Sequence, residues 1–402
     1  MSLMAVSEAL HRVLASASAE PLPDTETLRL EHAIGRVLAK PLRSLHNVPP
    51  WDNSAMDGYA LHADDIARAV ATGLPISQRI TAGMAPPPLE RGSCARIFTG
   101  APVPAGADTI EMQENVSVDE QGKAHFANTL KPGQNIRPQG QDIRAGSILL
   151  EPGIRLRPQD MGLIASVGMD TVEVIKPLRI AVLSTGDELV EPGQPLGAGQ
   201  IFNSNRYTLI GCLQRLGQQV IDAGILEDDP DATRKRLQSL AGRADVIITS
   251  GGVSVGEADF LGQTLRDHGE LAMWKLAIKP GKPFTLARFA GTPVLGLPGN
   301  PAAVLVTFLL LVRPYLLRRL GVHDVDPIQL EVPAGFEWQR AGNRDEYLRA
   351  RLEQGRVVLA GNQSSGVLSS ASQASGLVCI AAGKTVALGD TLPFLPFEGL
   401  FD

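Results

Sequence analysis

The chain has 402 residues, of which 44% are hydrophobic and 20% are charged. This length exceeds one ordinary hydrophobic core, so we expect two to four domains. The formal net charge of −6 gives no electrostatic footprint for nucleic acid or for an anionic membrane, and no basic run is interleaved with aromatic residues. The composition therefore favours a small-molecule partner and predicts neither a nucleic-acid nor a membrane partner.

The first residues, "MSLMAVSEALHRVLASA", have the pattern of an amphipathic helix rather than of a secretory signal. Glu8, His11 and Arg12 interrupt the apolar core that a signal peptide needs. The most apolar stretch, 302–312, is well short of the roughly 20 residues that span a bilayer, so it predicts a buried helix. The cysteines are far apart without a CxxC pair, which disfavours disulfides and structural zinc. We expect a cytoplasmic protein with buried cysteines.

Two composition regimes divide near Pro177. Before it, short apolar runs are broken by Pro and Gly, as in "NVPPWDN" and "AGMAPPPLERG". This spacing is typical of small β-rich lobes joined by turns, not of helices. We expect the N-terminal helix to pack against these lobes.

After Pro177 the pattern changes to strands that alternate with helices. The predicted strands are "RIAVLST", "QVIDAGI", "ADVIITS", "AMWKLA", "PFTLARF" and "TPVLGL", and the predicted helices cover 205–216, 231–240, 260–267 and 301–320. Such alternation predicts a parallel, doubly wound sheet, in which ligands bind beyond the carboxyl ends of the strands. Beyond Gly321 the β pattern returns and predicts a small barrel or sandwich.

Acidic residues follow three of these predicted strands. The loop "TSGGVSVGEADF" has glycines at the spacing of a phosphate-binding loop, but Glu257 stands where that loop carries its lysine, so it is not an ATPase loop. Adjacent carboxylates repel a phosphate unless a cation such as Mg²⁺ lies between them. The acids of the three loops are Asp187, Glu188, Asp228, Asp229, Glu257 and Asp259. A single acid can instead be a helix N-cap, above all Asp229 before Pro230, but their shared sheet edge favours a metal and phosphate site.

Lysines and a proline-rich turn follow two other strands. "KLAIKPGKP" carries Lys275, Lys279 and Lys282 around a rigid turn, and lysine suits an oxyanion as a compact charge. A solvated turn is the alternative. "GLPGNPAAVLVTF" places a Pro-Gly-Asn-Pro turn at a helix N-terminus, which is either an anion site or a plain helix start with Pro at its first position.

The stretch "PPWDNSAMDGYAL" crowds polar residues into a turn in the β-rich part. Turn chemistry alone explains Asp52, Asn53, Ser54 and Asp57 as well as a binding site does. "RIFTGAPVPAGAD" and "IRPQGQDIRAG" give Thr99 and Asp142 similar loop positions.

Together, "PPWDNSAMDGYA", "RIFTGAPVPAGAD", "GDELVEPG", "TSGGVSVGEADF", "KLAIKPGKPF" and "GLPGNPAAVLVTF" resemble the molybdopterin molybdenumtransferase family, MoeA and the E domain of gephyrin. The resemblance covers almost the whole chain. It implies a multi-domain α/β plus β fold: a doubly wound, molybdopterin-binding α/β domain with β-rich N-terminal lobes and a small C-terminal β-barrel. The implied domains are 1–26 with 45–52 and 137–176, an inserted lobe of 27–44 with 53–136, then 177–324 and 325–402.

The resemblance also implies an activity. Molybdate is inserted into adenylylated molybdopterin with Mg²⁺, and AMP is released. A homodimer is implied, with a cleft between the α/β domain of one subunit and the Asp57 and Thr99 lobe of the other, and other proteins of cofactor biosynthesis are further candidate partners. Implied catalytic residues are Glu188, Asp228, Asp259 and Asp57, the first three also as metal ligands. Implied substrate-binding residues are Thr99, Asp142, Ser250, Gly251, Gly252, Lys275, Lys279, Pro298, Pro301, Arg349 and Ser370.

Two other functions stay open on the sequence. A molybdopterin adenylyltransferase uses an α/β domain of the same type, but the "MDGYA" lobe and the C-terminal barrel would then have no role. A scaffold without catalysis is the other alternative. The full set of acids and lysines argues against it.

Overall fold

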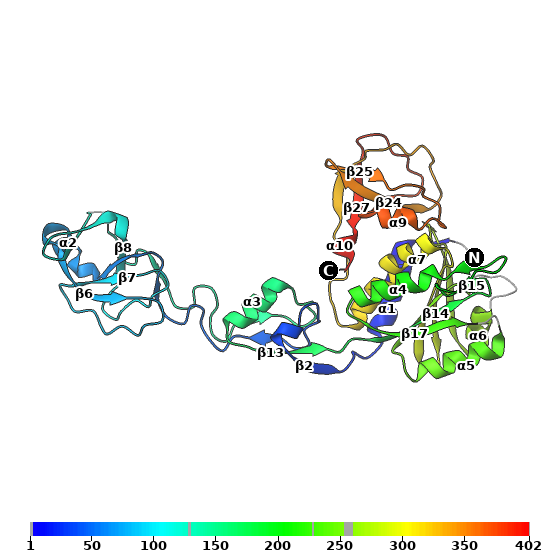
Figure 1. Ribbon diagram of the computed structural model, residues 1–402, viewed down its shortest axis with the longest axis horizontal. Coiled ribbons are helices and arrows are strands. Elements are labelled where there is room, and N and C mark those ends of the chain that lie inside the picture. Colours follow the sequence, from blue (N-terminus) through cyan, green and yellow to red (C-terminus); the bar gives the residue numbers. More distant parts are fainter. Residues whose placement is uncertain (1–2, 128–129, 227–228, 253–259, 402) are drawn as a thin grey trace.

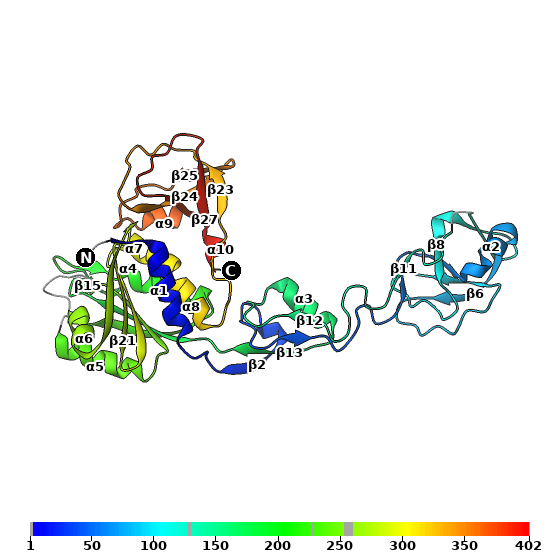
Figure 2. The same ribbon diagram turned by 180° about the vertical axis from the view of Figure 1, so that it is seen from behind.

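The computed structural model describes residues 3–127, 130–226, 229–252 and 260–401. The molecule is elongated (Figure 1). An α/β domain and a C-terminal domain form a body, and an arm leads from the α/β domain to a distal lobe. The view from behind shows the same separation of the distal lobe from the body (Figure 2). This organisation is the predicted multi-domain α/β plus β fold.

The α/β domain is built on a seven-stranded sheet with the order β1-β19-β21-β22-β18-β14-β17. Its strands are β1 (Leu3–Met4), β14 (Arg179–Thr185), β17 (Gln219–Leu226), β18 (Val246–Ser250), β19 (Gly269–Leu276), β21 (Pro283–Phe289) and β22 (Thr292–Leu297). β21 is antiparallel to both of its neighbours, so the sheet is mixed rather than wholly parallel. The remaining strands share one direction, and their carboxyl ends therefore lie at one edge.

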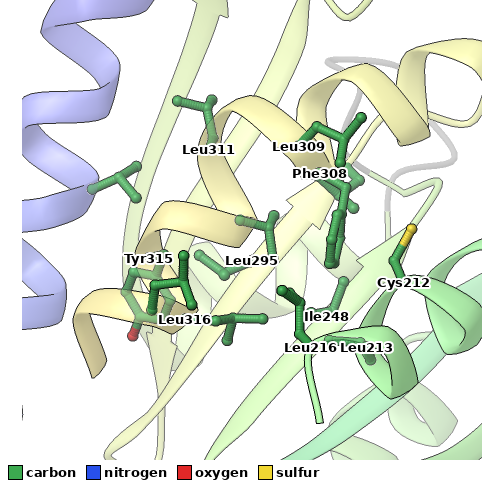
Figure 3. Close-up of a cluster of buried hydrophobic side chains, with 14 of the residues drawn as sticks. Cys212, Leu213, Leu216, Ile248, Leu295, Phe308, Leu309, Leu311, Tyr315 and Leu316 are labelled. Atoms are coloured by element: carbon green, nitrogen blue, oxygen red, sulfur yellow. The ribbon is translucent and has the colours of Figure 1, made fainter. Parts of the chain in front are cut away.

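Helices cover both faces of this sheet because successive strand residues alternate between the faces. In β14, Ile180 and Val182 enter one buried cluster, whereas Ala181 and Leu183 enter the other. The helices are α4 (Ser204–Arg215), α5 (Pro230–Ala241), α6 (Phe260–His268), α7 (Pro301–Thr307) and α8 (Arg313–Arg319), the last two joined by a π-helical turn over Phe308–Val312. Figure 3 shows the cluster beneath the last two helices and α4.

The N-terminal helix α1 (Val6–Ser18) belongs to the body, not to the β-rich lobes as predicted. Its buried residues Val6, Ala9, Val13 and Ala17 form one helical stripe that joins the larger core of the α/β domain. The preceding β1 pairs with β19. The prediction was wrong because an amphipathic stripe requires an apolar partner but does not identify it.

The predicted buried helix at 302–312 extends over Pro301–Arg319. By length and composition alone this stretch could cross a membrane, but 78% of it is buried inside the protein, as in a core helix. Of the cysteines, Cys94 and Cys212 are buried as predicted and Cys379 is partly buried. Burial raises the pKa of the Cys94 and Cys212 thiols to about 12.

The arm is made from segments far apart in sequence. β2 (Thr25–Arg29) pairs with β13 (Thr171–Ile175), and β3 (Leu42–Arg43) pairs with β12 (Ile148–Leu150). Residues 27–44 therefore pack with the arm, and their expected place with 53–136 is wrong. Helix α3 (Pro158–Ser166) also lies here, where no helix was predicted; its start has Pro158 and an Asp160 carboxylate that accepts from the Arg157 backbone, at 2.9 Å.

The distal lobe carries a six-stranded sheet with the order β8-β5-β7-β6-β10-β9. Its strands are β5 (Gly58–Leu61), β6 (Leu74–Ile80), β7 (Cys94–Ile97), β8 (Thr109–Met112), β9 (Val116–Val118) and β10 (Lys123–Phe126). A short helix, α2 (Ile66–Thr72), was not predicted. The pair of β4 (Asn53–Ser54) and β11 (Ile136–Arg137) links the lobe to the arm.

The C-terminal domain is a second six-stranded sheet, and it begins inside the α/β domain. β20 (Ile278–Lys279), from the lysine loop, pairs with β24 (Asp345–Glu353). The other elements are β23 (Leu330–Pro333), β25 (Arg356–Leu359), β26 (Gly376–Ile380), β27 (Thr391–Pro396), α9 (Ser369–Gln373) and α10 (Phe397–Phe401). A bridge between Ala334 and Val357 draws the two ends of this sheet together, as the predicted barrel requires.

Candidate functional site

The carboxyl edge of the α/β sheet brings together the loops that follow β14, β18 and β22. The hydroxyls of Ser184 and Ser250 lie 3.2 Å apart and are buried, so they join the ends of two neighbouring strands. The Gly251 backbone N–H donates to the carbonyl of Leu297 at 3.2 Å, which joins the third. Polar groups from three loops therefore meet, as the strand order predicts.

Two consecutive glycines follow β18 at this edge of the sheet. Gly251 and Gly252 have φ angles of +84° and +62°. A Cβ at Gly251 would lie 2.7 Å from the carbonyl oxygen of Thr185, and one at Gly252 would lie 2.7 Å from the Thr185 Oγ1. Since both the dihedrals and the close approach exclude a side chain, the turn presents bare backbone beside the loop of β14.

The acidic residues have different positions. Glu188 is exposed at the carboxyl edge, and its carboxylate lies against Gly186. Asp229 is the N-cap of α5 and accepts from the Ala232 backbone N–H at 2.7 Å, which confirms the capping alternative for this residue. Asp228, Glu257 and Asp259 lie outside the described residues. Within the described ranges, no group of three or more His, Cys, Asp or Glu side chains could hold a metal ion.

The lysines lie at the same edge, and one of them has a carboxylate partner. The Lys279 Nζ is 3.1 Å from Glu346 Oε2, and the two side chains are 48% and 7% exposed. Lys275 lies in β19 opposite Leu3, and Lys282 is exposed in the following turn. Sequence reasoning missed the Glu346 contact, because this residue belongs to a different domain.

The Pro-Gly-Asn-Pro turn begins helix α7, and hydrogen bonds with two other parts of the chain hold it in place. Pro298 is buried, and the side-chain amide of Asn205 donates to the carbonyl of Gly299 at 2.6 Å. Pro301 is the first residue of α7. The next backbone N–H, that of Ala302, donates to the carbonyl of Ser365 at 3.0 Å. A loop of the C-terminal domain thus occupies part of this helix N-terminus.

Arg349 and Ser370 are buried beneath that loop and hold it through hydrogen bonds. Arg349 is fully buried, and its guanidinium donates to the Ser370 Oγ at 3.1 Å and to the carbonyls of Asn362 and Ser364 at 3.1 and 3.0 Å. Burial lowers the pKa of Arg349. In this structure the two residues order the segment that carries Ser365, rather than facing solvent.

Asp57 and Thr99 meet in the distal lobe. The Asp57 Oδ1 accepts from the backbone N–H of Thr99 and from its Oγ1, each at 2.8 Å. These two bonds, with a smaller effect from the charge of Arg96, hold the pKa of Asp57 below its usual range. Thr99 is exposed and Asp57 is half-buried, so the ionised carboxylate is within reach of a ligand.

Arg96 is a polar residue of this site that the sequence did not single out. Its guanidinium donates to the carbonyl of Gly58 at 2.9 Å and lies 5.0 Å and 4.7 Å from the ring centres of Tyr59 and Phe98. Cation–π contacts at these distances fix the guanidinium next to Asp57. A lone arginine in a strand carries no local pattern, so only the fold reveals it.

The two groups of residues are far apart within one chain. The distal lobe lies at the opposite end of the molecule from the loops of the α/β domain (Figure 1). Asp142 is exposed in the segment between lobe and arm, where its backbone N–H donates to the carbonyl of Val48 at 3.0 Å. A single chain does not bring Asp57, Thr99 or Asp142 to the carboxyl edge.

This fold and this sheet edge define a multidomain protein built around a ligand-binding α/β domain. Family models match it in three parts: "MoeA N-terminal region (domain I and II)" at residues 4–168, "Probable molybdopterin binding domain" at 181–318 and "MoeA C-terminal region (domain IV)" at 331–397. The chain belongs to the MoeA family of molybdopterin molybdenumtransferases.

Similar proteins span nearly the full length. The molybdopterin molybdenumtransferase of Haemophilus influenzae is 38% identical over 94% of this chain and 96% of its own. The enzyme of that name from Nostoc sp. is 38% identical over 90% and 86%. A crystal structure of the molybdopterin biosynthesis moeA protein from Pyrococcus horikoshii superposes with a TM-score of 0.85 at 26% identity, over 98% of this chain and 100% of that one.

Proposed function

We propose that this protein transfers molybdate to adenylylated molybdopterin and releases AMP. The observation that carries the proposal is the meeting of the glycine turn, Glu188 and the lysine loop at one edge of the domain that matches the molybdopterin-binding family model. Relatives named molybdopterin molybdenumtransferase match 94% and 90% of the chain, too much to leave out the distal lobe or the C-terminal domain. This full-length match favours the transferase over an adenylyltransferase or a scaffold.

The residues of this edge divide into two binding roles. We assign the bare backbone of Ser250, Gly251 and Gly252, with the turn from Pro298 to Pro301, to the substrate because a glycine turn admits close approach of a phosphate or pterin group. Lys275 and Lys279 are assigned to the oxyanion, since an ammonium is a compact charge. Lys279 holds its ammonium against Glu346, so it enters the reaction already positioned. Positioning and charge neutralisation then supply most of the catalysis.

Magnesium is part of the proposal. Mg²⁺ prefers carboxylate oxygens together with substrate phosphates, and the exposed carboxylate of Glu188 at the sheet edge is a donor of that kind. We assign Asp228 and Asp259, which lie outside the described residues, as the other ligands. When bound, the ion would neutralise charge on the phosphates of the adenylylated substrate.

A homodimer would bring the distal site to the sheet edge. The distal lobe, which carries the bonded pair of Asp57 and Thr99, lies at the other end of the molecule from the α/β domain (Figure 2). This pair is therefore too far from the lysine loop of its own chain to share a ligand with it. We propose that a second subunit supplies this pair, and Asp142, to each cleft. Other proteins of cofactor biosynthesis, which hand over the substrate or accept the product, are proposed as transient partners in the cytoplasm.

One assay tests the activity. Purified protein is incubated with adenylylated molybdopterin, molybdate and Mg²⁺, and AMP release and cofactor formation are measured together. Equal yields of AMP and cofactor are expected. Formation of adenylylated molybdopterin from molybdopterin and ATP, without molybdate-dependent AMP release, would show an adenylyltransferase instead, and no turnover of either kind would leave a scaffold.

A further inference from the structure

A cavity of about 560 Å³ lies at the junction of arm and body. Two chain segments connect the arm to the body here, the one before β2 and the one between β13 and β14. Arg179, Gln219 and Asp245, which line the cavity, stand at the amino-terminal ends of β14, β17 and β18. The cavity therefore lies at the opposite sheet edge from the candidate active site and is independent of it.

The lining of the cavity is more polar than apolar, and its apolar part comes from prolines and leucines of the two connecting segments. Pro21, Leu22 and Pro23 line it from the first segment, and Pro177 and Leu178 line it from the second. Prolines have no backbone N–H, so these walls offer few donors. The volume falls within the range of roughly 300 to 1,000 Å³ that is typical of small-molecule sites. These walls suit the apolar body of a ligand.

The carboxylates that line the cavity are all neutralised. Each has its own cationic partner: Asp24 with Lys176 at 3.6 Å, Glu26 with Arg36 at 2.6 Å and Asp245 with Arg179 at 2.8 Å. The Asp245 Oδ2 also accepts from the Arg179 backbone at 2.7 Å, so both oxygens of this carboxylate are engaged. One further cation lines the cavity, namely Arg319.

Arg319 has no carboxylate within ion-pair distance among the described residues, although its charge does act on Asp245. It is 6% exposed, and its Nε and Nη1 have no hydrogen-bond acceptor among the described residues. The nearby hydroxyl of Tyr315 is neutral and supplies no counter-charge. Burial tends to raise the pKa of Asp245, but the hydrogen bonds from Arg179 and the charges of Arg179 and Arg319 outweigh this effect and lower the pKa. Asp245 is therefore ionised, and its one negative charge is divided between two arginines. A buried cation with two unfilled N–H donors is costly, and an anion at the guanidinium would offset part of that cost.

We propose that this cavity binds a small organic oxyanion, a carboxylate or phosphate head group at Arg319 with its apolar body against the proline walls. Arg319 is the last residue of α8, and the walls come from both connecting segments. A bound molecule would therefore contact the arm and the body at once.

The proposal is tested by calorimetric titration of the full-length protein with benzoate and phenyl phosphate, and with benzyl alcohol as the uncharged control. Saturable binding of at least one anion in the millimolar range or tighter is expected, with none for benzyl alcohol. Arg319→Gln should weaken anion binding about tenfold or more, because it removes a charge-assisted contact. Arg318→Gln, the same charge change next to it on a residue that does not line the cavity, should have little effect.

A second pair of variants covers the case that Arg319→Gln does not fold. Leu22 is 59% exposed and lines the cavity, so substitutions there are tolerated. Leu22→Glu should repel the anion and weaken binding about tenfold relative to Leu22→Gln. Equal affinity of the wild type, Arg319→Gln and Leu22→Glu, or no saturable anion binding by the wild type, would overturn the proposal.

Discussion

The α/β domain and the distal lobe position their polar residues in different ways. At the sheet edge, parallel strands deliver several loops to one place, and the backbone is packed so closely at Gly251 that no side chain fits. In the distal lobe, Asp57 accepts two hydrogen bonds from Thr99, and Asp57 is half-buried whereas Thr99 is exposed. The first site is fixed by backbone geometry and the second by side chains, so they should respond differently to substitution.

The largest effect is expected for Gly251→Ala. The new Cβ would meet the carbonyl of Thr185 at 2.7 Å, and displacement of the turn should lower activity on the order of a hundredfold. AMP release measures the effect. Gly291→Ala is the matched control, since its φ of +81° carries the same backbone cost of roughly 1–2 kcal/mol but nothing lies within 4 Å of the added Cβ. Similar activity losses in both variants would contradict the role of the close contact.

Lys279→Ala tests the lysine loop. If the ammonium holds molybdate, the molybdate concentration for half-maximal turnover should rise about tenfold to a hundredfold, while binding of adenylylated molybdopterin stays nearly intact. Because the Glu346 carboxylate is only 7% exposed and loses its cationic partner, a loss of stability should accompany the change, so thermal unfolding is measured beside activity. Lys282→Ala, an exposed lysine of the same turn, is the control. Loss of nucleotide binding with an unchanged molybdate response would assign Lys279 to the phosphate instead.

Asp57→Asn addresses the distal site and the proposed dimer together. The amide removes the charge, so activity should fall about tenfold. It keeps the shape and an oxygen acceptor at this half-buried position, so stability should change little. Mixing these subunits with Glu188→Gln subunits should recover part of the activity, since one cleft of the heterodimer would be intact. No recovery in a mixture shown to exchange subunits would place both residues in one subunit's site.

The smallest effect is expected for Thr99→Val, which removes one of the two bonds to Asp57. The Thr99 bonds lower the pKa of Asp57, so the carboxylate that they favour is present above that pKa and is lost as the pH falls through it. The variant should lower activity a few fold and move the acidic limb of the pH profile to higher pH. Thr99→Ser keeps the hydroxyl and should keep the profile. An unmoved limb in Thr99→Val would separate Asp57 from the pH dependence.

The α/β domain could be predicted closely because its signals are local. The runs 283–289 and 292–297 coincide with β21 and β22, and the predicted helices agree with α4, α5 and α6 within a few residues. Buried strands on a doubly covered sheet are nearly continuous apolar runs, and the turns between them are marked by Gly, Pro and Asn. The order of the strands then places the loops at one edge.

The arm and the contacts between domains could not be predicted in this way. β2 and β13 are separated by more than a hundred residues, and neither strand shows which segment it pairs with. The same holds for the partners of Lys279 and Ala302, which come from the C-terminal domain. Local patterns give the type of an element, whereas partners distant in sequence depend on packing between elements.

The pairing of β20 with β24 has a consequence for how the chain can be divided. The lysine loop contributes a strand to the C-terminal sheet, so one short segment is a structural member of two domains. A fragment that ends before residue 325 would expose the unpaired edge of β20, and such edges template aggregation. The two domains of the body therefore share a strand, and exchange of either domain as a module would have to preserve the pairing of β20 with β24.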